Sequence, residues 1–399
     1  MKNIPLIIAL LVLSVSCSRY PSEVKRTLCF AGGNKVELER VLERYKKSGE
    51  EDKYMAACFL IGNMGGRGSK DGPALRKYYR ELLSFYDRPV VDMWSLYAFE
   101  DSLFNTLDFS RLEMYYDARN ISASYLEKRI ADAFSVRDVK WCRDLSFEDF
   151  CEYVLPYRVG DELLEDWFSD YRNTFGLALD SLALDDSVTL EDFCGAVTSL
   201  FPEPHRNYTN YPAGKPSPAP SSLKRIAGGT CEDYLGLFTY IGRSYGVPVA
   251  TDYTPQWANH SKNHSWCGIP SGDSTFHYSV GEPLFLAREK PFSFKLAKVY
   301  RRMNSIQKES LGARVRPENL PPTLRSQRIR DVSAEYMPVT DVSLSGLFRD
   351  SRSKHVFLCC FDDKDWVAVA GDRRRGAKAV IADMGYPAVY LPAYYADGF

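Results

Sequence analysis

The sequence lacks the patterns that assign many proteins to a functional class directly. Its 399 residues carry a formal net charge of only −1 at pH 7, so nothing draws the whole chain toward nucleic acid. Its ten cysteines form no C-x-x-C pair, and no zinc-finger spacing or RNA-reading signature is present. His260, His264 and Cys267 are too few and too poorly spaced to make a metal site. We therefore expect no nucleic-acid partner, no metal and no cofactor.

The first residues have the composition of an export signal. Lys2 gives a positive start, an almost wholly apolar stretch runs from Ile4 to Val15, and Cys17 follows closely. This stretch is too short to cross a membrane as a mature helix. The ending is similar to a lipoprotein processing site, with Leu13 one place further from the cysteine than is usual. We predict a signal peptide over 1–17 and an exported protein of the bacterial cell envelope, anchored to the membrane by a lipid on Cys17; a periplasmic or secreted protein is the alternative.

The other cysteines do not make a disulfide framework. Ten cysteines in an exported protein would suggest bridges, but most lie within apolar patterns, as Cys58 does between Met55 and Leu60. Cys359 and Cys360 would point to opposite faces of a strand, which makes a bond between them improbable. We expect mainly buried free thiols, with room for one or two bridges.

Residues 228 to 251 combine the features of a nucleophilic cysteine. A glycine pair before Thr230 and Cys231 lets the backbone turn sharply and places Cys231 in the first turn of a helix, where exposed amides favour a thiolate. The apolar residues from Tyr234 to Ile241 have helical spacing, and a Gly-Val-Pro sequence ends the helix before a strand over 247–251. The alternative is that Cys231 is a small buried hydrophobe, as most cysteines are.

His264 lies in a segment that predicts a strand. The alternation from His264 to Ile269 would place His264 and Trp266 on one face. A helix-borne cysteine facing a strand-borne histidine is a usable catalytic pair, because the imidazole can take the thiol proton and later protonate the leaving group. A purely structural histidine is the alternative.

In this order, Gly-Gly-Thr-Cys, the helix, Gly-Val-Pro, the strand and Asn-His-Ser-Trp resemble the core of the transglutaminase-like cysteine enzymes. The resemblance implies a papain-like α+β core with Cys231 as nucleophile and His264 as base. It also implies an Asp on the next strand that orients the imidazole, but the expected position falls on or near Ser279. Other residues that could take its place by geometry are Asp273, Glu282 and His277.

The same resemblance implies chemistry on amide bonds. Cys231 would attack the carbonyl of a peptide, protein or glycopeptide, and water or an amine would release the acyl group. Trp257, Trp266 and Thr230 would line the substrate cleft. The alternative is a degenerate binding or structural protein, because loss of an orienting residue can cost orders of magnitude in rate and leave the fold intact.

The chain ahead of this core predicts a helical domain. Amphipathic or capped segments predict helices over 37–45, 52–63, 122–133, 146–155 and 189–201, with Ser146 and Thr189 as caps. Asn34 to Leu42, Ala56 to Met64 and Phe147 to Arg158 also look like a family of exported bacterial proteins that place a helical domain before a transglutaminase-like core.

Two segments predict connectors. Six prolines between Pro202 and Ser222 predict an exposed loop, which is either a plain connector or, through Tyr208 and Tyr211, a cover over the site. The basic residues over 295–330 predict a solvated connector, with a patch for acidic polysaccharide or lipid as the alternative.

The last part of the chain predicts a small β module. Segments 355–361, 366–370, 377–381 and 388–395 look like strands parted by turns. The predicted fold class is therefore α+β, with a signal peptide (1–17), a helical domain (18–178), a transglutaminase-like core (179–330, with the Pro-rich loop 202–222) and a β-sandwich-like module of antiparallel strands (331–399).

Overall fold

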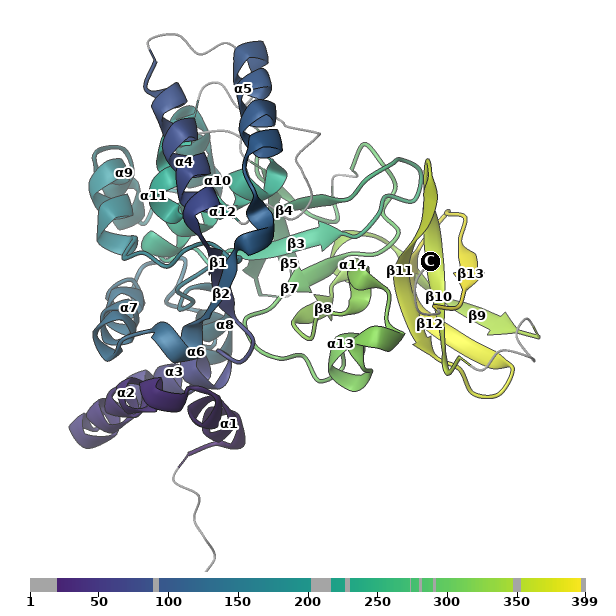
Figure 1. Ribbon diagram of the computed structural model, residues 1–399, viewed down its shortest axis with the longest axis horizontal. Helices are drawn as coiled ribbons and strands as arrows, with labels where there is room; N and C mark the ends of the chain where they lie inside the picture. Colours follow the sequence, from purple (N-terminus) through teal and green to yellow (C-terminus); the bar gives the residue numbers. More distant parts are fainter. Residues whose placement is uncertain are drawn as a thin grey trace, which may run out of the picture.

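The protein combines helices with antiparallel sheets, which confirms the α+β class (Figure 1). The computed structural model describes residues 20–88, 93–201, 217–226, 230–272, 274–279, 282–289, 292–346 and 353–395. The predicted signal peptide, the lipidation residue Cys17, the candidate residue Asp273 and the lid residues Tyr208 and Tyr211 lie outside these ranges. No helix in the described ranges is long and apolar enough to cross a membrane.

The first half of the chain is mainly helical. All five predicted helices are present, and the structure adds α1, α4, α5, α6 and α9 together with a small antiparallel pair of strands, β1 and β2. The bounds are α1 Ser22–Phe30, α2 Lys35–Ser48, α3 Glu51–Gly62, β1 Gly68–Asp71, α4 Pro73–Tyr86, α5 Met93–Thr106, β2 Glu113–Tyr116, α6 Asp117–Asn120, α7 Ala123–Ser135, α8 Phe147–Tyr153, α9 Phe168–Leu184 and α10 Leu190–Ser199.

Two helix starts are set by the predicted caps. The Ser146 hydroxyl accepts a hydrogen bond from the N–H of Asp149 at 3.0 Å. Thr189 and Asp192 form a reciprocal capping box at the start of α10. Both caps satisfy N–H groups that a helix leaves unpaired at its first turn, so these boundaries follow from local sequence.

The predicted domain boundary at residues 178/179 is wrong, because it falls inside α9. Tyr171, Phe175 and Leu179 of this helix are buried in one core that also contains Phe238 and Tyr240 from α12 (Cys231–Ser244). A boundary falls where few contacts cross it, and here a single apolar core runs from the first helices into the part that carries Cys231.

A six-stranded antiparallel sheet forms the centre of the molecule (Figure 1). Its spatial order is β6-β5-β4-β3-β7-β8. Helix α12 covers one face at β4, where Cys267 and Ile269 join the same core as Leu235 and Phe238. The bounds are β3 Ala250–Thr254, β4 His264–Ser271, β5 Ser274–Tyr278, β6 Phe285–Leu286, β7 Tyr300–Arg302 and β8 Ile329–Asp331.

The prediction of a solvated connector over 295–330 is wrong. This segment supplies β7 and β8 of the central sheet, and Arg301 is only 1% exposed. The predicted boundary at 330/331 also falls inside β8. The many basic residues of this segment led to the connector prediction. A buried Arg can pair with an acidic residue that is far away in the sequence, and local composition does not show such a pair.

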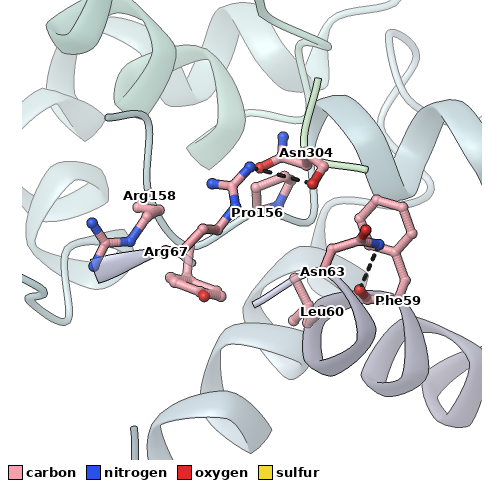
Figure 2. A pocket seen from close by; sticks show the side chains of 8 residues that line it. Phe59, Leu60, Asn63, Arg67, Pro156, Arg158 and Asn304 are labelled. Carbon is pink, nitrogen blue, oxygen red and sulfur yellow. Dashed lines mark hydrogen bonds between the residues drawn. The ribbon is translucent and has the colours of Figure 1, made fainter. Parts of the chain in front are cut away.

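The chain after β7 is fastened to the helical part. Glu152 of α8 accepts the N–H of Asn304 at 2.7 Å, and the Arg67 guanidinium donates to the carbonyl of Asn304 at 3.3 Å. Arg67, Pro156 and Asn304 line a cavity of only about 10 Å³ at this junction (Figure 2). The two parts are therefore closely packed here.

The chain ends in two small antiparallel sheets, which lie at one end of the molecule (Figure 1). One has the order β11-β10-β13 and the other pairs β12 with β9, and side chains from both share one apolar core. The predicted strands are all present. The bounds are β9 Val339–Ser345, β10 His355–Asp362, β11 Asp365–Arg373, β12 Lys378–Gly385 and β13 Leu391–Ala393.

Candidate active site

Cys231 is the first residue of helix α12, as predicted. The preceding Thr230 is the N-cap: its hydroxyl accepts the N–H of Asp233 at 3.3 Å, and its own N–H donates to the Asp233 carboxylate at 2.9 Å. This capping box holds the first turn by two reciprocal hydrogen bonds. The role of Thr230 in the described structure is thus to fix the position of Cys231.

The Cys231 thiol is half-buried. Burial raises the pKa of Cys231, although hydrogen bonding from the backbone of Ser265 and of Glu232 acts in the opposite direction. The sequence predicted a thiolate favoured by the helix start. In the structure the cost of burying a charge is larger, so the resting sulfur is a neutral thiol at pH 7.

His264 begins strand β4 and lies among aromatic rings. Its ring stacks on Trp257 with centroids 5.8 Å apart and lies 5.7 Å from Trp266. Burial lowers the pKa of His264, which keeps the imidazole neutral at pH 7. A neutral imidazole is the form that can accept a proton.

The structure brings Cys231 next to β4, but not into a hydrogen bond with His264. Ser265, Cys267 and Ile269 face α12: the Ser265 hydroxyl donates to Glu232 at 3.4 Å, and the other two join the α12 core. Successive strand residues point to opposite faces, so His264 and Trp266 share the other face. No hydrogen bond joins the His264 ring to Cys231 within the part of the chain that the structure describes.

None of the described candidates for the third position contacts the imidazole through a hydrogen bond. Ser279 follows β5, and its carbonyl accepts the N–H of the exposed Glu282 at 2.9 Å. His277 is buried on β5 and stacks on Phe285 at 4.4 Å. Among residues 274–279 and 282–289, the structure therefore offers no carboxylate that orients His264.

The two tryptophans predicted for the cleft are largely buried. Trp257 is 6% exposed and Trp266 is 1% exposed. Trp266 packs against Phe292 at 4.8 Å and against Tyr336 at 5.3 Å. Both tryptophan rings pack against His264 and leave little of their own surface for a ligand.

An ion pair that no sequence pattern predicted lies beside Cys231. Arg302 of β7 donates to the Glu232 carboxylate at 2.5 Å, with side chains 43% and 49% exposed. The Arg302 charge, helped by Ser265, lowers the pKa of Glu232 against the effect of burial. Arg302 also lies over the ring of Tyr253, 5.2 Å from its centroid. Arg302 comes close to Tyr253 because β7 lies beside β3 in the sheet. No local sequence pattern could have predicted this contact or the ion pair with Glu232.

In the described ranges, no group of three or more His, Cys, Asp or Glu side chains is placed to hold a metal ion. The nine cysteines from Cys29 onward are all free thiols. No known protein family, no curated protein and no solved structure shows a significant match to this chain.

Proposed function

We propose that the protein is a cysteine-dependent enzyme of the transglutaminase-like type that acts on amide bonds of peptides, proteins or glycopeptides. The observation that carries the proposal is the position of Cys231, at the capped start of α12 and hydrogen-bonded by the backbone of Ser265, the residue after His264. In the same proposal the core has a papain-like fold, and a lipid on Cys17 holds the exported protein at the cell envelope.

The proposed reaction proceeds through a thioester. Sγ of Cys231 attacks the amide carbonyl carbon and its proton passes to the ring of His264, which then protonates the departing amine. Water or a second amine attacks the thioester and frees the thiol. Backbone N–H groups at the start of α12 would stabilise the oxyanion.

This mechanism requires His264 to turn away from its contacts with Trp257 and Trp266. Catalytic hydrogen bonds are often long or absent before substrate binds and form only in the complex. The lowered pKa of His264 suits this role, because the ring is ready to accept a proton at neutral pH.

A peptide acyloxymethyl ketone, which alkylates catalytic cysteines, tests the proposal. The extent of labelling at Cys231 is measured by mass spectrometry against Cys29, an exposed thiol in the same chain. We expect labelling of Cys231 to exceed that of Cys29, and to fall at least about tenfold in His264→Ala while Cys29 is unchanged. Equal labelling of Cys231 in both proteins would remove the proposed pair.

The second candidate is a binding or structural protein that kept the fold and lost the reaction. The raised pKa of Cys231 and the lack of an orienting carboxylate among the described residues favour it. In that case Cys231→Ser would leave the biological role of the protein intact, whereas the enzyme would lose it.

A further inference from the structure

The residue after the proposed nucleophile carries a charge that opposes ionisation of the thiol. Glu232 follows Cys231 in the first turn of α12. A carboxylate beside a thiol raises the free energy of the thiolate, because like charges repel each other. Burial raises the pKa of Cys231 most, and the charges of Glu232 and Asp233 raise it further. The reaction at Cys231 therefore needs a cation that compensates these carboxylates.

The two acidic residues of this turn have different partners. The Asp233 carboxylate accepts the N–H of Thr230 at 2.9 Å and completes the capping box of α12. Glu232 instead binds side chains of the central sheet: its Oε1 accepts the hydroxyl of Ser265 on β4 at 3.4 Å and the guanidinium of Arg302 on β7 at 2.5 Å. Helix capping thus accounts for Asp233 and leaves the role of Glu232 open.

Arg302 is held in place beside this turn. Its backbone pairs with Thr251 on one side and Ile329 on the other, so β7 fixes the position of the residue within the sheet. Against the effect of burial, Glu232, Tyr253 and Cys231 raise the pKa of Arg302. The electrostatic interaction of the guanidinium therefore extends beyond Glu232 to the nucleophile.

The titratable groups on this turn and on the strands beside it have opposing or no charge. They are Glu232 and Asp233 of α12, Tyr253 of β3, His264 of β4 and Arg302 of β7. Burial raises the pKa of Tyr253 to about 12 and lowers that of His264, so both side chains are neutral at pH 7. Arg302 therefore supplies the positive charge of this group.

A purely structural role is the alternative for the ion pair, because it joins α12 to β7. Both side chains are nearly half exposed, at 43% and 49%, and an exposed ion pair contributes only about 0–1 kcal/mol to stability. The two roles differ in a measurable way. A brace is lost equally when either partner is replaced, whereas opposite charges act on a thiolate with opposite sign.

We propose that Arg302 is a positioning residue for the reaction at Cys231, whose positive charge compensates Glu232 and makes the thiolate accessible at neutral pH. Glu232 in turn holds the guanidinium beside the first turn of α12. The importance of this pair for catalysis rests on the proposed function. Its effect on the thiol does not, because ionisation of Cys231 requires no turnover.

The test measures the rate at which iodoacetamide, a neutral reagent, alkylates Cys231 in the full chain, by peptide mapping at pH 8. We expect Arg302→Met to slow this reaction at least about threefold and Glu232→Gln to accelerate it at least about threefold. These factors allow for the stronger nucleophilicity of a less acidic thiolate, which partly offsets its smaller population. About 0.5 M NaCl should reduce both effects, because salt screens exposed charges.

Two further variants separate charge from bracing. Arg302→Lys keeps the positive charge, and the double variant Glu232→Gln/Arg302→Met removes both charges, so each should react within about twofold of the parent rate. Cys29, an exposed thiol, is the reference within each chain. Arg44→Met is the matched control, because it breaks an ion pair with Glu127 on α2, away from α12, and should leave the rate at Cys231 unchanged (Figure 1).

Rate changes of the same sign in Arg302→Met and Glu232→Gln would overturn the proposal, as would unchanged rates in both or a double variant that reacts as slowly as Arg302→Met. The thermal midpoint of each variant shows whether it is folded. Should Arg302→Met not fold, the sign of the effect in Glu232→Gln and its dependence on salt still decide. Opposite charge effects together with equal probe labelling of the parent and His264→Ala would refute only the enzyme.

Discussion

Asp252 and Arg301 form a bidentate ion pair inside the central sheet. Nε and Nη2 of Arg301 lie 2.8 and 2.7 Å from the two carboxylate oxygens, and the side chains are 0% and 1% exposed. The Tyr336 hydroxyl donates to Asp252 at 2.6 Å, and Glu335 accepts from Arg301 at 2.8 Å. Both members of the pair thus make further hydrogen bonds, which offset part of the cost of removing two charges from water.

Replacing Arg301 by Met should destabilise the protein strongly. The substitution leaves the carboxylate of Asp252 buried without its cation, which costs about 3–5 kcal/mol in comparable sites. Urea unfolding measures the loss of free energy. Arg316→Met is the control, because the Arg316 side chain is 85% exposed and its removal should change stability by less than about 0.5 kcal/mol. If the two variants unfold alike, the ion pair does not stabilise the fold.

The pair of Asp252 and Arg301 is an example of a contact that the sequence could not predict. Capped helices and alternating strands are local patterns, and they were predicted from residues such as Ser146 and Thr189. Asp252 and Arg301 meet only because β3 and β7 are neighbours in the sheet. Gly268 on β4 belongs to the same arrangement, since a Cβ there would lie 2.2 Å from Oδ2 of Asp252.

The same distinction between local patterns and contacts of distant segments applies to the candidate site. The helix start at Cys231 and the strand at His264 follow from spacing and were predicted. The raised pKa of the thiol, the aromatic contacts of the imidazole and the partner of Glu232 depend on packing between distant segments. Local sequence does not determine how deeply a given atom is buried, so these properties could not be predicted from it.

Alkylation of Cys231 by iodoacetamide should speed up continuously from pH 6 to pH 9. Burial raises the pKa of this thiol above its ordinary value of 9.0, so the reactive thiolate fraction increases about tenfold per pH unit over this range. Peptide mapping of the alkylated chain gives the rate at each pH. A plateau at acid or neutral pH would reveal a preformed ion pair with His264 and contradict the resting state described above.

Removal of the cap at Thr230 should loosen the first turn of α12. Thr230→Val keeps the shape of the side chain and deletes the hydroxyl that accepts the N–H of Asp233, at a cost of about 1 kcal/mol. Thr230→Ser retains the hydroxyl and should stay within a few tenths of a kcal/mol of the parent protein in urea unfolding. A loss in Thr230→Ser but not in Thr230→Val would mean that the methyl group, and not the cap, stabilises this turn.

Lys298 should hold the C-terminal module to the central sheet. Its ammonium group donates to the carbonyls of Ala382 and Asp383 at 2.7 and 2.8 Å and pairs with Asp331. Lys298→Met deletes both part-buried hydrogen bonds, at a cost of about 0.5–1.5 kcal/mol for each bond, and amide hydrogen exchange in β12 should accelerate. The exposed Lys308 provides the control, because Lys308→Met should leave exchange in β12 unchanged. Normal exchange in both variants would show that apolar packing alone holds the module.

The proposed lipidation of Cys17 gives the most direct test of location. Cells that express the full chain with radiolabelled palmitate should yield a labelled protein in the membrane fraction, since covalent lipid chains supply the apolar surface that membrane binding needs. Cys17→Ala should abolish both the label and the membrane association. Cys29→Ala removes an exposed thiol from the described part of the chain and should change neither. Label that survives in Cys17→Ala would refute an anchor on Cys17, and absence of label from the parent protein would favour the periplasmic or secreted alternative.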